Sequence, residues 1–92
     1  MHASAAPATE ATILSRLIRP ERDDLSHEAA RAILNLEFDD EDRARMHELA
    51  AKGQAGALSP AEDTELEGYC RVGRFLDLIH SKARRSLKKA GR

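Results

Sequence analysis

The first cluster of apolar positions along the chain has four members: Ile13, Leu14, Leu17 and Ile18. Their spacing predicts a short helix, or an extended docking segment, over residues 12–19. The segment ends near Arg19, because Pro20 disfavours helical backbone in the residue that precedes it. Residues 1–11 are small and polar and show no apolar period, so we expect them to form a disordered lead.

Two further helices are predicted between residues 26 and 55. Ser26 is a suitable N-cap for the first of them, which stops around Leu36. Asp39 is the corresponding N-cap of the next helix, and the acids that follow it suit the positive end of the helix dipole. That helix is expected to end near Ala55. Two glycines are candidate left-handed terminators: Gly53 and Gly56.

A fourth and much longer helix is predicted from residue 60 onward. Ser59, Pro60 and Glu62 supply a capping serine, a proline in the first turn and a glutamate three residues after the cap. Nothing obliges the helix to stop before Ala90, so it reaches about 30 residues, or about 45 Å. This length exceeds the diameter of so small a domain. Its last turns must therefore project, bend at one of its glycines, or lie against another chain.

At about 100° per residue, one side of this helix forms a continuous core stripe. Its members are Leu66, Tyr69, Val72, Gly73, Leu76, Ile79, His80, Ala83 and Leu87. Phe75 lies at the edge of the stripe, and Leu78 falls on the opposite, charged side. Taken together, the segments predict an all-α fold: a small bundle of three to four helices with a long C-terminal helix, in one domain over residues 12–92.

Composition fits a folded chain with a heavily solvated exterior. Hydrophobic residues make up 41% and charged residues 34% of the 92 residues. No run approaches the roughly 20 apolar residues that span a bilayer, and the opening MHASAAPATEAT lacks the features of a signal peptide, so we expect a cytoplasmic protein without membrane contact. Cys70 is the one cysteine, which excludes an internal disulfide and favours a small packed side chain.

Charge is distributed unevenly along the chain, although the formal net charge is only −1. Residues 21–67 hold 14 acids and 5 bases, whereas residues 68–92 hold 8 bases and one acid. Such a division indicates either an acidic partner for the basic C-terminal tail or a tail that folds back on its own acidic neighbour.

Two patterns in the sequence are similar to known catalytic or phosphate-binding motifs, but each lacks a residue that the motif requires. His47 and Glu48 resemble the start of a zinc-protease helix, but Ala51 stands where the second histidine is needed. Gly68 and Gly73 are spaced like a phosphate loop without the lysine and hydroxyl residue that must follow, and a close helix crossing better explains two glycines within a helix. We therefore expect no enzyme, no metal and no cofactor.

A binding role remains, and it has two versions. The first is a protein-binding module that docks through the long helix and the Ile13–Ile18 segment onto a protein partner or, as a homo-oligomer, onto a second copy. Its expected interface residues are Tyr69, Phe75, Leu76, Leu78 and Ile79. The alternative is a nucleic-acid-binding protein that uses the basic tail. Its expected contacts are Lys82, Arg84, Arg85, Lys88 and Lys89.

From Ile13 to Lys89 the chain resembles a group of small bacterial helical proteins. The resemblance is carried by an opening like ILSRLIRPERDDLS, a middle like LEFDDEDRARMHELAAKGQAGALSPAEDTELEGY and an ending like LDLIHSKARRSLKK. Proteins of that group are often encoded beside an HNH-type endonuclease. The resemblance implies a regulatory or antitoxin-like partner of a nuclease, and it assigns no catalytic or binding residue.

Overall fold

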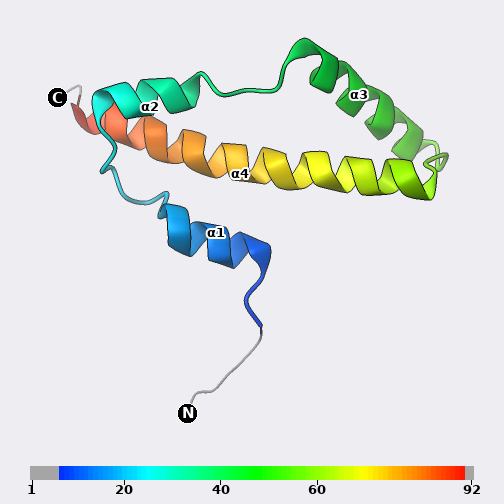
Figure 1. The fold of residues 1–92 in the computed structure, drawn as a ribbon, viewed down its shortest axis with the longest axis horizontal. Helices are drawn as coiled ribbons and strands as arrows, with labels where there is room; N and C mark the ends of the chain where they lie inside the picture. The colour runs from blue at the N-terminus through cyan, green and yellow to red at the C-terminus, as the bar shows by residue number, and fades with distance from the viewer. Residues whose placement is uncertain (1–6, 91–92) are drawn as a thin grey trace. The chain divides into compact units, whose positions relative to one another are not determined.

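A computed structural model describes the backbone of residues 7–90 and the side chains of residues 7–89. The described residues form four helices: α1 (Glu10–Ile18), α2 (His27–Leu34), α3 (Asp40–Gln54) and α4 (Pro60–Ala90). The all-α fold with a long C-terminal helix is thereby confirmed (Figure 1). Within the described part of the chain, no helix is long and apolar enough to cross a membrane.

Helix α1 begins earlier than the apolar pattern indicates. Thr9 is its N-cap, and the backbone N–H of Thr12 donates to Thr9 Oγ1 at 3.2 Å while the backbone N–H of Thr9 donates to Thr12 Oγ1 at 3.0 Å. The first helical residue is therefore Glu10, two positions before residue 12. Of the expected disordered lead, residues 1–6 lie outside the described part of the chain. At the other end, Arg19 adopts left-handed backbone with φ 54° and precedes Pro20.

The predicted caps of the next two helices are confirmed. Ser26 Oγ accepts from the backbone N–H of Ala29 at 3.1 Å, and Asp39 Oδ1 accepts from that of Asp42 at 2.8 Å. Helix α2 ends at Leu34, two residues before the predicted end, and α3 ends at Gln54. Of the two candidate terminators, Gly56 takes the left-handed backbone with φ 69°, which glycine adopts without a Cβ clash.

Helix α4 starts at the predicted capping box and runs for 31 residues. The backbone N–H of Glu62 donates to Ser59 Oγ at 3.1 Å, and that of Ser59 donates to Glu62 Oε1 at 3.0 Å. The helix continues through Gly68 and Gly73. A Cβ placed on either glycine would meet nothing within 4 Å. Neither glycine therefore marks a close helix crossing among the described residues, and that expectation is wrong.

The helices belong to two compact units, where the sequence predicts one domain. The hairpin unit is residues 35–77, in which a short turn joins α3 to the first turns of α4 (Figure 1). The terminal unit comprises the described residues up to Leu34 and those from Leu78 onward. In it, α1 and α2 flank the last turns of α4 from different sides (Figure 1).

Each unit buries few residues completely. In the terminal unit Ala30 and Ala83 are fully buried, and Ser86 is buried with its Oγ accepting the backbone N–H of Leu25 at 3.2 Å. In the hairpin unit Leu49 is fully buried, and among the described residues it is the largest side chain that is. So thin an interior supports the fold while leaving much apolar surface at its edges.

Candidate protein-docking surfaces

Ion pairs connect α3 to the first turns of α4 within the hairpin unit. The Arg45 guanidinium donates to both carboxylate oxygens of Glu65, at 2.9 and 2.8 Å, and lies 3.1 Å from Glu48. Lys52 Nζ donates to Glu62. The Arg45 guanidinium lowers the pKa of Glu65, and the two carboxylates raise the pKa of Arg45. Part of the acidic charge of residues 21–67 is therefore neutralised within its own unit.

The Glu62 carboxylate makes the hairpin unit sensitive to acid. Lys52 lowers the pKa of Glu62 to about 2 from an ordinary 4.5, with help from the backbone N–H of Ser59. Because the folded pKa is depressed, the stabilisation is fully present above pH 4.5 and is lost as the pH falls towards 2. We expect Glu62→Gln to flatten the fall in the free energy of unfolding over this range, measured by denaturant melts. Asp63→Asn, a neighbouring acid in the same first turn, is the control and should retain the slope.

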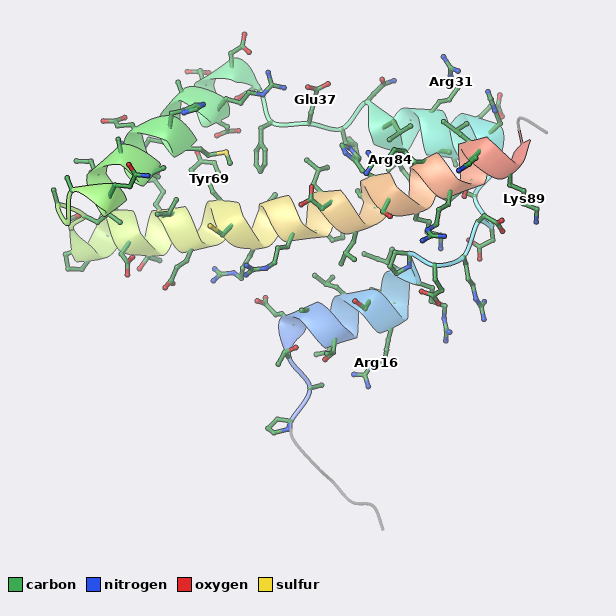
Figure 2. The ribbon with its side chains drawn as sticks, turned by 180° about the vertical axis from the view of Figure 1, so that it is seen from behind. Arg16, Arg31, Glu37, Tyr69, Arg84 and Lys89 are labelled. Carbon is green, nitrogen blue, oxygen red and sulfur yellow. The ribbon has the colours of Figure 1, made fainter. Side chains whose placement is uncertain are left out.

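Tyr69 packs inside the hairpin unit. Its hydroxyl donates to Asp42 Oδ1 at 2.7 Å, and its ring meets Phe38 edge to face with centroids 6.0 Å apart. Figure 2 shows the side chain extending from α4 toward α3. The interface prediction placed Tyr69 among the docking anchors, but these contacts give it a role in holding α3 to α4.

The hydrogen bond to Asp42 gives Tyr69 a measurable signature. The carboxylate and burial raise the pKa of Tyr69 to about 12 from an ordinary 10.0. The chain has one tyrosine and no tryptophan, so tyrosinate absorbance reports this residue alone. As long as the helical circular dichroism shows that the protein is folded, we expect the Tyr69 hydroxyl to ionise only well above pH 10. The Asp42→Asn variant should lower the midpoint of this titration. A midpoint near 10 in the folded wild type would contradict the hydrogen bond.

The first turns of α4 also carry apolar side chains that the hairpin unit leaves exposed. Val72 is 52% exposed, although the helical wheel predicts it to be part of the core, and Phe75 is 39% exposed. Leu76, the third expected anchor, is half-buried. Cys70 is exposed, so the expectation of a packed thiol is wrong.

The remaining two expected interface residues lie in the terminal unit. Leu78 and Ile79 are half-buried there. The Leu78 side chain is covered in part although the wheel places it on the charged side of α4. One turn further, Lys82 Nζ donates to the backbone carbonyl of Ile18 at 2.6 Å, which ties the end of α1 to that side of the helix.

The predicted nucleic-acid contacts divide into two groups. Lys82 is only 14% exposed and lies 3.0 Å from Asp24, whose pKa it lowers, while Lys89 lies 3.5 Å from Asp23. The basic tail therefore folds back on acidic neighbours through these two lysines. The other three are exposed: Arg84, Arg85 and Lys88.

Helix α1 presents a second exposed apolar surface. Leu17 is 77% exposed and Ile13 is 48% exposed, and because they are four residues apart they share one face of the helix. Leu14 and Ile18, next to them in sequence, are half-buried. None of the nine residues of α1 is fully buried. On another side, Arg16 points away from α4 (Figure 2).

The two units also carry formal charges of opposite sign. Counting described residues, the terminal unit holds nine basic and five acidic side chains, a formal charge of +4. The hairpin unit holds five basic and 11 acidic side chains, a formal charge of −6. The terminal unit also contains a hollow of about 240 Å³ with a mixed charged lining: Glu21, Asp23, Arg85, Lys88 and Lys89.

Residues 7–90 contain no cluster of three or more histidine, cysteine or acidic side chains that could hold a metal ion. Comparison with protein-family models, with curated proteins and with solved structures gives no match. The function is therefore inferred from the chain's own surfaces and charges.

Proposed function

We propose that this chain is a non-catalytic protein-binding module that docks through the exposed apolar faces of α1 and α4. The observation that carries the proposal is the state of α1. It is a nine-residue helix with Leu17 77% exposed and no residue fully buried. Isolated helices of fewer than about 12 residues are marginal in water, so such a helix depends on packing for its stability. A partner that covers Ile13 and Leu17 would supply that packing.

The energetics favour a partner on this face. Burying apolar surface is worth about 25 cal/mol per Å², and one leucine or isoleucine side chain contributes about 1.5–3 kcal/mol when fully covered. Leu17 and Ile13 lie one turn apart, which is the spacing of anchors in helix-in-groove recognition. The end of α1 is held by the Lys82 hydrogen bond to the Ile18 carbonyl, so the face is presented in a defined place within its unit.

The test is affinity capture from the native host with matched variants. We expect Leu17→Gln to lose a specific protein that the wild type retains, because the polar side chain removes the anchor while keeping a good helix former. Ser15→Gln, also exposed on α1, is the control and should retain that protein. A nuclease is one candidate partner, suggested by the resemblance to proteins encoded beside HNH-type endonucleases. Equal recovery with both variants would contradict docking through α1.

A second candidate function is binding of nucleic acid by the terminal unit. It is favoured by the +4 charge of that unit and by the exposure of Arg84, Arg85 and Lys88. Replacing these three residues with glutamine should weaken DNA or RNA binding. The slope of log affinity against log salt concentration should become shallower by about one for each cation that no longer neutralises a phosphate. Arg74→Gln, in the acidic hairpin unit, is the control. Absence of wild-type retention on nucleic acid at low salt would end this candidate.

A further inference from the structure

Two hydrogen bonds attach the segment that contains α1 to the last turns of α4. The backbone N–H of Leu25 donates to Ser86 Oγ at 3.2 Å, and Lys82 Nζ donates to the backbone carbonyl of Ile18 at 2.6 Å. Ser86 and Lys82 are four residues apart, so they lie on one face of α4. The chain between the two attachment points, residues 19–24, is mostly exposed.

The two attachments differ in their access to water. Ser86 is 2% exposed, so its bond fixes the chain firmly at Leu25. The Lys82 side chain is 14% exposed and shares its ammonium with Asp24, which lies 3.0 Å away and is 54% exposed. A polar contact at the edge of solvent exchanges with water more easily than a buried one. The Lys82 attachment is therefore the one that opens first.

Lys82 meets α1 at the point where a short helix lacks partners. The last carbonyls of a helix have no acceptor role within it, and they form the negative end of its dipole. The Lys82 ammonium donates to one of them, on Ile18, and brings positive charge to that end. Because an isolated helix of nine residues is marginal in water, the helical state of α1 depends on this contact with α4.

Packing between α1 and α4 adds little to that contact. Figure 1 and Figure 2 show α1 running in the same direction as the last turns of α4. Leu14, one turn before Ile18, is therefore level with Leu78, one turn before Lys82, and both leucines are half-buried. No residue of α1 is fully buried, whereas α2 contributes the fully buried Ala30 to the same unit. A segment with few buried contacts has low local stability.

We propose that α1 opens from α4 as a unit while α2 and the last turns of α4 stay folded, and that the Lys82 ammonium is the latch that holds it closed. In the closed state the helix forms and carries Ile13 and Leu17 on its exposed face. In the open state the nine-residue helix loses the contact that maintains it, and the face is lost with it. The inference rests on the proposed function, because it makes Lys82 the residue that regulates docking through α1.

Native-state hydrogen exchange of the full chain tests the opening without any partner. In low concentrations of guanidinium, the α1 amides should exchange at least about tenfold faster than those of α2 and the last turns of α4. Their rate should hardly change with denaturant, because a local opening exposes little surface, whereas the rates of the other two helices should rise with each increment. A single rate and a single denaturant dependence for all three helices would overturn the separate opening of α1.

Substitution of Lys82 tests the latch. Lys82→Met should speed exchange of the α1 amides about tenfold or more, because it keeps the apolar stem and removes the charged donor. Lys88→Met is the matched control, since Lys88 is exposed on the same helix, and it should leave α1 exchange unchanged. Equal α1 exchange in the two variants would overturn the latch. Protection lost equally from α2 and α4 in Lys82→Met would also overturn it, because Lys82 would then stabilise the whole unit.

The Leu17→Gln variant separates the latch from the proposed function. Leu17 is 77% exposed, so its replacement should leave α1 exchange as in the wild type while removing the docking anchor. If α1 opens only together with α2 and α4 but Leu17→Gln still loses the partner, the latch is wrong and docking through α1 stands. If α1 opens locally and Leu17→Gln retains every partner, docking through α1 is wrong and the latch stands.

Discussion

Leu49→Ala is expected to lower the free energy of unfolding by about 2–5 kcal/mol. Leu49 is the largest side chain that is fully buried among the described residues, and it lies on α3 in the hairpin unit. Truncation removes its transfer free energy and leaves a cavity that the surrounding helices fill only in part. Small domains have about 5–15 kcal/mol of stability in all, so a substantial loss of helical structure is expected on mild warming.

Denaturant melts followed by circular dichroism measure this loss. Leu17→Ala is the matched control, because it is the same chemical change at a leucine that is 77% exposed. It should change the free energy of unfolding by no more than about 0.5 kcal/mol. If the two variants melt alike, Leu49 does not have the buried position that the structure gives it.

Ala83→Leu is expected to lower the free energy of unfolding by about 1–3 kcal/mol. Ala83 lies on α4 and is fully buried in the terminal unit, where Ala30 of α2 is also fully buried. Two buried alanines indicate that α2 and the last turns of α4 approach closely, which leaves no room for a leucine. The larger side chain must displace α2 or adopt a strained rotamer.

Thermal and denaturant melts check this second expectation. Ala51→Leu, at an exposed position of α3, is the control for helix propensity and added hydrophobicity. It should leave stability nearly unchanged. A gain in stability for Ala83→Leu would show that the contact has unfilled space, and the close approach of α2 to α4 would then be wrong.

Local sequence chemistry determined where three of the helices begin and how long α4 is. Ser26, Asp39 and Ser59 each cap the helix that the sequence assigned to them. An N-cap can be predicted from sequence because its side chain accepts a hydrogen bond from a backbone N–H no more than three residues away. The N-cap of α1, Thr9, was not predicted. The apolar pattern that marks this helix begins only at Ile13, four residues after the cap. The length of α4 follows from an absence of breaking residues, which is also visible locally.

The burial of individual side chains on α4 could not be read in the same way. A helical wheel assigns one inward face to a whole helix, whereas α4 has different neighbours in its two units. In the hairpin unit Val72 is left half exposed, although the wheel places it in the core. In the terminal unit Ser86, a polar residue seven positions after Ile79 at the edge of the core stripe, is buried and accepts the Leu25 amide. Ser86 and Leu25 are 61 residues apart in the sequence, so no local pattern could predict the hydrogen bond between them.

The candidate docking residues divide along the same line. The apolar Ile13–Ile18 segment and Phe75 were visible as surface candidates from sequence, because apolar residues at helical spacing indicate a face that needs cover. Tyr69 and Lys82 were assigned to binding, and the structure gives them internal partners in Asp42 and in Asp24 with the Ile18 carbonyl. A polar group reaches such partners only when distant segments are brought together.

By itself, then, the sequence determined that this chain is helical, where three of its four helices are capped, and that its last helix is long. The tertiary structure alone decided which apolar residues stay exposed, which cations are neutralised and how the charge divides into a basic and an acidic unit. The physical reason is range. Capping and periodicity depend on atoms within one or two turns, whereas burial and ion pairing depend on side chains far apart in the chain.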